Sequence, residues 1–284
     1  MPVDPERALG AQLPVLESRW DQDDVILYHL GVGAGDPPTD PAELRYTYEG
    51  NLAVLPSFAT ASAFPALAGV GGVPGLEFNP ALLLHGEHEI AVQGPIPTAA
   101  SVVHRGRVAE LWDKGKAALA VVEVVTTDGA GKELFTNRAS LFLRGEGGFG
   151  GEPGPPSFSA APDGEPDFVV ASPTLPQQAL LYRLSGDKNP LHADPGFAAI
   201  AGFDRPILHG LCSFGMLCKA VVDRALDGDV TRVSGYRARF SGVVYPGESL
   251  VINVWNEGDH LLVTAVTAER GKPVISNGKV TLTG

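Results

Sequence analysis

The sequence predicts an α+β fold built from two repeats, each with one helix followed by a curled antiparallel sheet. Glycine and proline crowd the middle of the 284-residue chain, where regular structure cannot form, and this pattern indicates a linker. Short segments of the two halves resemble each other: residues Ile26–Gly31 of the first half match Leu180–Ser185 of the second. Both halves also end in runs rich in Val, Thr and Ile with a period of two, which is typical of antiparallel hairpins.

The linker divides the chain into an N-terminal repeat at 1–144, the linker itself at 145–170, and a C-terminal repeat at 171–284. We expect strands in each repeat where the period of two is clearest. These strands lie at 102–111, 118–126, 133–143, 250–255, 261–268 and 274–282.

The long helix of the second half is expected to begin at Leu208 or His209 and to end near Arg224. Its residues are apolar on most sides, as expected for a helix wrapped by a sheet. A shorter helix is expected over 195–201, because Gly202 is a typical C-terminal stop.

The matching long helix of the first half is poorly encoded. Pro65 interrupts residues 59–68, and several glycines follow. Two interpretations remain open. Either the helix is shortened or lost, which leaves a vacant slot in the N-terminal repeat, or the segment is a glycine-rich surface loop.

Composition and charge limit the class of protein. A hydrophobic content of 44% describes a globular chain with ample core. The net charge of -12, without any block of Lys and Arg, excludes nucleic acid as an expected partner. No apolar run is long enough to span a membrane, so no membrane partner is expected. Cys212 and Cys218 are expected to be reduced and buried, which favours a cytoplasmic location.

An acid, an amide and an imidazole lie within six positions of one another, at Asp187, Asn189 and His192. An Asp and a His this close can share one water molecule, as the hydration of an activated double bond requires. Alone, the spacing favours a capped helix start instead, with Asp187 or Asn189 as the N-cap and Pro190 at the first helical position.

The surrounding residues favour the catalytic interpretation. Three segments carry a longer signature: LYRLSGDKNPLH at 181–192, GFDRPILHG at 202–210 and RFSGVVYPGESL at 239–250. In the first half, VLPSF at 54–58 and LHGE at 84–87 complete the pattern. Together they resemble the hydratase 2 or MaoC-like family, the (R)-specific 2-enoyl-CoA hydratases, in its longer two-repeat form.

This resemblance implies a double hotdog fold, acyl-CoA thioester substrates, no separate cofactor and a homodimer. It implies (R)-specific hydration of trans-2-enoyl-CoA to (3R)-3-hydroxyacyl-CoA in β-oxidation. His192 would accept a proton from water, Asp187 would orient that water, and Asn189 would tie the loop or the water in place. The backbone N–H of Gly210, at a helix start, would stabilise the thioester oxyanion. Residues 31–37 of the first half lack such a set, so one site per chain is expected.

The substrate contacts are less well defined. Lys188 and Arg205 flank the catalytic segment and either bind coenzyme A phosphates or are ordinary surface charges. The acyl tail is expected to contact apolar residues of the first half, Leu55, Phe58 and Phe64. A slot there would favour long or bulky acyl groups, such as fatty or steroid-like chains.

Two rival functions remain open: dehydration of 3-hydroxyacyl thioesters in synthesis, and a non-catalytic acyl-CoA-binding subunit. The remaining histidines receive lesser roles. His209 is expected to pack beside the site. His85 and His88, in a strand, are expected to face opposite sides, so no metal site is predicted there.

Overall fold

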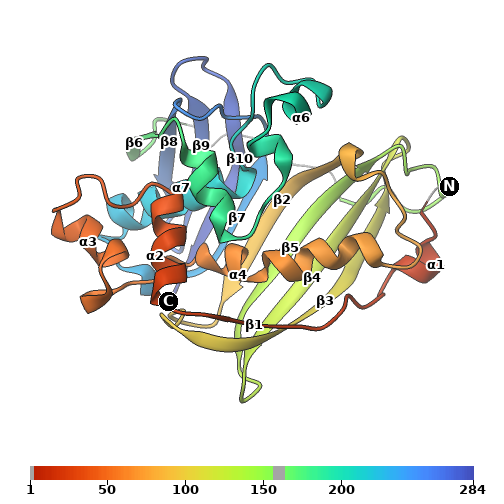
Figure 1. Ribbon diagram of the computed structural model, residues 1–284, viewed down its shortest axis with the longest axis horizontal. Helices are drawn as coiled ribbons and strands as arrows, with labels where there is room; N and C mark the ends of the chain where they lie inside the picture. The colour runs from red at the N-terminus through yellow and green to blue at the C-terminus, as the bar shows by residue number, and fades with distance from the viewer. Residues whose placement is uncertain (1–2, 156–163) are drawn as a thin grey trace.

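The computed structural model describes residues 3–155 and 164–284, which form one antiparallel sheet of ten strands with helices against it (Figure 1). The strands are β1 (Leu16–Trp20), β2 (Leu83–Val92), β3 (Ala100–Asp113), β4 (Ala117–Asp128), β5 (Glu133–Arg144), β6 (Phe168–Pro173), β7 (Val233–Phe240), β8 (Ser249–Asn256), β9 (His260–Thr267) and β10 (Pro273–Leu282). Their order is β1-β3-β4-β5-β2-β7-β10-β9-β8-β6, so each half of the chain supplies five neighbouring strands.

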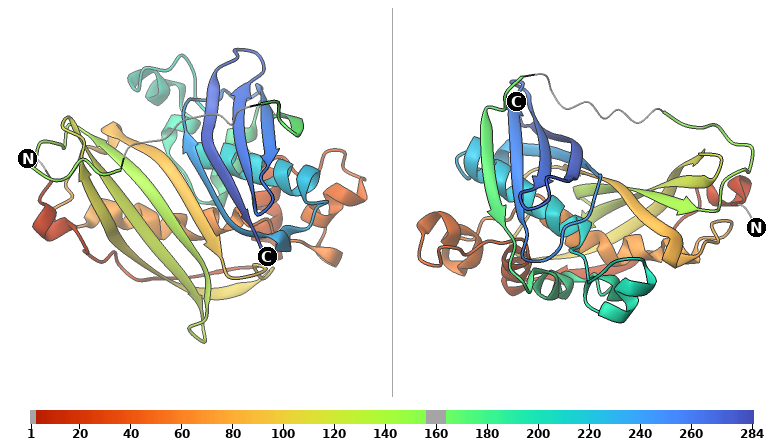
Figure 2. Two further views of the ribbon diagram at one scale, coloured as in Figure 1. Left: turned by 180° about the vertical axis from the view of Figure 1, so that it is seen from behind. Right: turned by 90° about the horizontal axis from the view of Figure 1, so that it is seen from above.

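Each half-sheet curls around a helix from its own half, α4 (Phe58–Leu67) in the first and α7 (Gly210–Ala225) in the second (Figures 1 and 2). The six strands expected from the period-two runs are β3, β4, β5, β8, β9 and β10, and the short second-half helix is α6 (Pro195–Ile200). The expected α+β double hotdog is confirmed.

Small side chains let the first helix lie close to its sheet. Alternate residues of β4 point to one face, and Ala118, Ala120, Val122 and Val124 are all fully buried there. The helix α4 crosses this face (Figure 1), and the Asn137 side-chain amide of β5 donates to the Ala59 carbonyl at 3.2 Å. Alanine at the contact reduces the separation between the layers without leaving a void.

The first-half helix is shortened rather than lost. The helix α4 has 10 residues against 16 in α7, and a 3₁₀ segment at Ala68–Gly72 continues it. Pro65 lies inside α4 and cannot donate to the Ala61 carbonyl. In contrast, α7 is buried along most of its length, as its apolar sequence predicted.

The two halves meet around a pair of matching tyrosines. Tyr28 lies on α2 (Gln22–Gly31) and Tyr182 on α5 (Gln178–Tyr182), the two segments that resemble each other in sequence. Their ring centroids are 6.1 Å apart, and both rings are buried. The Gln178 side-chain amide donates to the Gly31 carbonyl at 2.6 Å. The sequence repeat therefore corresponds to two helices in contact at the interface of the halves.

The remaining α-helices of the described residues are two short ones, α1 (Pro5–Ala8) and α3 (Pro41–Thr47). The expected linker at 145–170 follows β5 directly, but 156–163 lie outside the described residues, and β6 already begins at Phe168. Within the described ranges, no helix combines the length and apolarity that a membrane span would need.

A buried histidine connects α2 to the next two segments. The His29 Nδ1–H donates to the Tyr46 carbonyl at 2.8 Å, and Nε2 accepts from the Leu55 N–H at 3.1 Å. Burial lowers the pKa of His29 to about 4. Only the neutral ring fits, because protonation of Nε2 would leave the Leu55 N–H without an acceptor.

This environment predicts acid sensitivity. With an ordinary pKa of about 6.5, His29 of the unfolded chain takes up a proton between about pH 6.5 and 4 that the folded protein does not. The free energy of unfolding should therefore fall as the pH falls through this window. The variant His29→Gln should unfold about 2 kcal/mol more easily at pH 7 and should show a shallower decline toward pH 5 in urea titrations.

The matched control is His260→Gln, at the half-buried start of β9 where the ring contacts the exposed Asp259, and this variant should keep the wild-type decline. An equally steep decline in His29→Gln would show that this histidine does not govern the acid response.

Candidate active site

Residues 186–192 carry the candidate catalytic side chains and are called the catalytic loop here. One glycine and one capping amide shape this loop. Gly186 has a φ of 127°, a left-handed conformation that favours glycine, and it ends the turn that follows α5. The Asn189 side chain then accepts from the Leu191 N–H at 3.0 Å and caps the 3₁₀ turn Pro190–His192. The Asp187 carboxylate accepts from the Asn189 N–H at 3.0 Å. The residues that cap this turn therefore also fix the Asp187 carboxylate relative to the His192 ring, so the helix-cap interpretation and the active-site interpretation are compatible.

The tautomer of His192 is set by a backbone carbonyl. Its Nδ1 lies 2.8 Å from the Ile207 carbonyl oxygen, which can only accept, so Nδ1 carries the proton and Nε2 is free to accept one. The side chain is only 8% exposed. Burial lowers the pKa of His192, although the Ile207 carbonyl and the Asp187 carboxylate oppose this shift. The ring is therefore a neutral base at neutral pH.

His209 forms the wall beside this base. Its ring lies 3.8 Å from that of His192, at an interplanar angle of 31°. The His209 Nε2–H donates to the Asp187 backbone carbonyl at 3.2 Å. Burial, reinforced by His192, lowers the pKa of His209 to about 2, so the ring stays neutral. The position beside the site is the one expected from the sequence.

One acid and two imidazoles converge at this point. Ligand atoms of Asp187, His192 and His209 all lie within 4.8 Å of one another, and no other group of three such side chains is this close within 3–155 and 164–284. A water molecule can bridge the carboxylate and His192 Nε2 over this distance. The two rings are tilted by 31° relative to each other, and one nitrogen of each ring already donates to a backbone carbonyl.

The N-terminus of α7 supplies hydrogen-bond donors beside the acid and the base. The helix begins at Gly210, directly after His209, and the first N–H groups of a helix have no intrahelical acceptor. Gly210 lines the same cavity as Asp187 and His192. A Cβ on Gly210 would lie 3.2 Å from the Phe240 ring, so glycine leaves space at this point. The geometry can therefore stabilise a negative oxygen close to Asp187 and His192.

The cavity has a volume of about 1260 Å³ and reaches from the catalytic loop into the N-terminal half. Its first-half walls include residues of β2 to β5, several of them charged. The apolar part of these walls lies at the end of α4 and the 3₁₀ segment after it, with Phe64, Leu67, Ala68 and Val70, and at Leu141 of β5. The shortened helix thus borders an apolar space, as the first of the two open interpretations expected.

Two of the three expected tail residues lie elsewhere. Phe64 lines the cavity, but Leu55 and Phe58 are buried in the core and do not line it. The Phe58 ring packs against Trp20 and Tyr28, with centroids 5.5 Å away in each case. Large apolar side chains near the start of α4 are needed to fill the space under the sheet, so the prediction was wrong for these two residues.

The two expected phosphate-binding cations also lie away from the cavity. Neither Lys188 nor Arg205 lines it, and both are exposed. The Arg205 guanidinium lies 4.6 Å from the Tyr245 ring centroid, which is a cation–π contact. The geometry supports the reading of ordinary surface charges that the sequence left open.

The expectation for His85 and His88 was wrong. A β-bulge between His85 and Glu87 shifts the register of β2, so both histidines face the same side. His85 Nε2 and His88 Nδ1 are 3.2 Å apart, and His88 Nε2 lies 2.9 Å from the Asn137 side-chain oxygen. Burial lowers the pKa of His85 to about 3 and of His88 to about 4. Gly86 within the strand was the signal that could have predicted the bulge.

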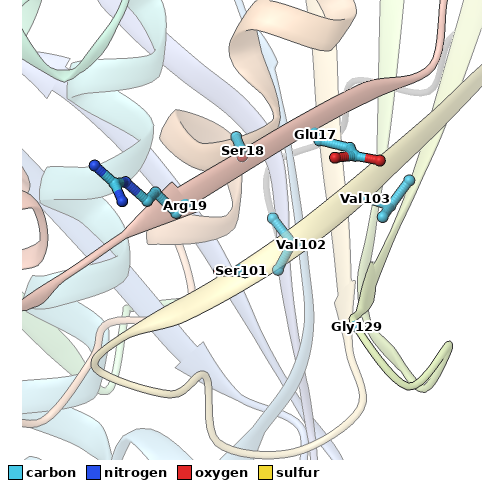
Figure 3. A pocket seen from close by; sticks show the side chains of 7 residues that line it. All are labelled: Glu17, Ser18, Arg19, Ser101, Val102, Val103 and Gly129. Carbon is cyan, nitrogen blue, oxygen red and sulfur yellow. The ribbon is translucent and has the colours of Figure 1, made fainter.

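A second, shallow depression lies along the outer strands β1 and β3 (Figure 3). Glu17 and Arg19 extend in different directions there, and Val102 and Val103 are the apolar side chains that line it (Figure 3). No acid and base converge on it. The functional site is therefore the cavity at the catalytic loop.

Residues 18–145 match the family described as the MFE-2 hydratase 2 N-terminal domain, and residues 157–278 match the MaoC-like domain. The chain is 49% identical to the enoyl-CoA hydratase ChsH3 of Mycobacterium tuberculosis, over 98% of both chains. It is 40% identical to the peroxisomal enoyl-CoA hydratase 2 of Arabidopsis thaliana, over 94% of this chain and 92% of that one. This chain belongs to the hydratase 2 family. The membership predicted from the sequence signature is confirmed.

Solved structures agree with this assignment of the hydratase 2 family. The crystal structure of a MaoC-like dehydratase from Phytophthora capsici is 32% identical, covers 99% of both chains and superposes with a TM-score of 0.88. The similarity therefore extends over both repeats and not only over the catalytic loop.

The Gly210 N–H can be tested by a pair of substitutions. His209 has φ −59° and ψ 135°, the conformation that suits a residue before proline, so Gly210→Pro fits the first helical position and removes only the donor. Gly210→Ala keeps the donor and adds a comparable Cβ beside Phe240. If this amide stabilises the oxyanion, the kcat of the proline variant should be about 100-fold below that of the alanine variant in a hydration assay. Equal kcat values, with equal thermal stability, would exclude this role.

Proposed function

We propose that this protein catalyses the (R)-specific hydration of trans-2-enoyl-CoA to (3R)-3-hydroxyacyl-CoA. The observation that carries the proposal is the convergence of Asp187, the free Nε2 of His192 and the N-terminus of α7 in one cavity. The names of the relatives in Mycobacterium tuberculosis and Arabidopsis thaliana support the same reaction class.

In the proposed mechanism, a water molecule hydrogen-bonds to the Asp187 carboxylate and to His192 Nε2. His192 accepts a proton as the water oxygen bonds to C3 of the enoyl thioester. The electron pair of the double bond moves toward the thioester oxygen, where the Gly210 N–H stabilises the developing charge. A proton returned from the acid–base pair to C2 completes the addition. No electrons are gained or lost overall, so the reaction needs no cofactor beyond the coenzyme A of the substrate.

The positions of the three polar side chains define their proposed roles. Asp187 balances the charge on protonated His192, because its carboxylate raises the pKa of that ring. Asn189 acts on the loop rather than on the water, since its oxygen caps the Pro190–His192 turn. His209 stays neutral and holds the His192 ring in place through the contact between the two rings.

The direct test is an assay with purified variants. Asp187→Asn and His192→Gln should each lower kcat by about 100-fold or more, because each removes one partner of the water. The loss of enoyl-thioester absorbance reports the rate, and chiral analysis should identify the (3R) product. Arg205→Gln, a surface control near the loop, should retain wild-type activity. Near wild-type turnover in either active-site variant would refute its assignment.

The apolar arm of the cavity supports long or bulky acyl groups as substrates. Ala68 is the most suitable position for testing this substrate preference, because its small side chain is exposed and lines the cavity. The variant Ala68→Trp should lower kcat/KM for a long-chain enoyl-CoA at least about tenfold and should leave crotonyl-CoA nearly unaffected.

The control is Ala201→Trp, which is exposed at the end of α6 and does not line the cavity. Equal losses for short and long substrates in Ala68→Trp would refute an acyl-tail site along α4.

A cytoplasmic location and a homodimer complete the proposal. Cys212 and Cys218 are free and buried, and two unpaired cysteines agree with a reducing compartment. The homodimer rests on the resemblance of the sequence to its family, and sedimentation would test it.

A further inference from the structure

The sheet divides where its two halves meet. Strands β2 and β7 lie side by side (Figure 1) and pair from Ala91 with Gly235 as far as Glu87 with Arg239. Beyond that point β2 stays with β5 as far as Leu83, while the chain after Arg239 stays with β10, because Phe240 pairs with Ile275.

Two diverging segments border the resulting gap, and both line the cavity. They are the start of β2, at 84–86, and the chain after Arg239, at 240–243. The cavity therefore reaches a slot in the sheet between the two repeats, where the His85 and Phe240 rings contact each other at a centroid distance of 5.1 Å.

Cavity residues lie on both faces of this sheet. Side chains alternate between the faces along a strand. On β7, Ala238 is buried on the core side, whereas Arg237 and Arg239 point to the other side. Arg237, Arg239 and Lys279 all line the cavity that also contains Asp187 and His192. The slot thus connects an outer basic surface to the inner acid–base pair.

The charges on the outer face form a row across six strands. The backbone register places these residues directly opposite one another, in the order Arg107, Glu123, Arg138, Glu89, Arg237 and Lys279. The sign alternates until the last pair, where Arg237 faces Lys279. Like charges directly opposite on neighbouring strands are destabilising.

This unfavourable pair lies at the mouth of the slot. Among the described residues, neither Arg237 nor Lys279 takes part in an ion pair, whereas the nearby Arg239 Nε lies 3.4 Å from Glu87 Oε1. An anion between the two cations would remove their repulsion and would accept charge-assisted hydrogen bonds from both.

We propose that Arg237 and Lys279, together with Arg239, bind the phosphates of coenzyme A on the outer face, and that the pantetheine arm passes through the slot to the acid–base pair. This inference rests on the proposed function. Stacked sheet layers lie about 10 Å apart, and an extended pantetheine arm can span a distance of this order. The site replaces Lys188 and Arg205, which lie outside the cavity.

The experiment compares two thioesters of the same acyl group. One is the trans-2-decenoyl thioester of coenzyme A, and the other is that of N-acetylcysteamine, which has no phosphate. The double variant Arg237→Gln with Lys279→Gln should lose about tenfold to 100-fold in kcat/KM with the coenzyme A thioester, mostly through KM. With the N-acetylcysteamine thioester, it should match the wild type within about twofold. The difference should shrink as the salt concentration rises.

The matched control is Arg107→Gln, at the opposite end of the same row and outside the cavity lining. It removes a cation from the same face and should leave both rates unchanged. The inference is overturned if the double variant keeps wild-type kcat/KM with coenzyme A, or if both thioesters lose activity equally.

Binding of adenosine 3′,5′-bisphosphate, measured by calorimetry, tests the same site without turnover. The wild type should bind this coenzyme A fragment at least about tenfold more tightly than the double variant, and Arg107→Gln should bind like the wild type. Equal binding by wild type and double variant overturns the inference.

The experiments distinguish failure of the proposed function from failure of the phosphate-binding inference. A wild type that hydrates neither thioester refutes the proposed function, while the fragment still reports on the basic surface. If the double variant does not fold, the single variants Arg237→Gln and Lys279→Gln give the same comparison on the exposed face.

Discussion

The antiparallel pairing of β2 with β7 is the interaction on which the rest of the structure depends. It joins two half-sheets into one, so that a catalytic loop from the second repeat lies over a helix of the first. Gly186 of that loop approaches α4 closely: a Cβ there would lie 3.8 Å from the Phe64 ring and 4.0 Å from the Ala61 carbonyl oxygen. Neither repeat alone could contain both the acid–base pair and the apolar arm of the cavity.

Within the site, burial does most of the chemical tuning. An exposed imidazole would be partly protonated near neutral pH, but burial lowers the pKa of both His192 and His209. The bond from His192 Nδ1 to the Ile207 carbonyl then decides which nitrogen can act. The Asp187 carboxylate lines the same cavity as this base and, in the proposed mechanism, holds the water beside it.

Much of this could be predicted from the sequence because local signals and tertiary structure agree. The period-two runs became β3–β5 and β8–β10, and α7 begins within two residues of its expected start because an apolar stretch follows a glycine. The catalytic loop could be predicted because the residues that form its cap, its turn and its acid are adjacent in the chain.

Other features depend on register and packing that one sequence does not reveal. His85 and His88 share a face only because of the bulge beside Gly86. Proximity in sequence favoured Lys188 as a phosphate ligand, whereas strand pairing places Arg237 opposite Lys279. Leu55 and Phe58 could not be separated from Phe64 by residue type, since only the fold decides which apolar side chains fill the core.

The unequal lengths of α4 and α7 show how the two repeats differ in function. In the second half, α7 must stay long and buried, because its first N–H groups face the reacting centre and its body anchors them under the sheet. The first half has no such donor to hold, and so Pro65 and the following glycines are tolerated there. The shorter helix leaves space beside Phe64 and Val70, in the cavity that Asp187 and His192 also line. The same shortening would disrupt α7 and the donors at its start, and for this reason the proposed acyl-binding space lies in the repeat without the proposed catalytic residues.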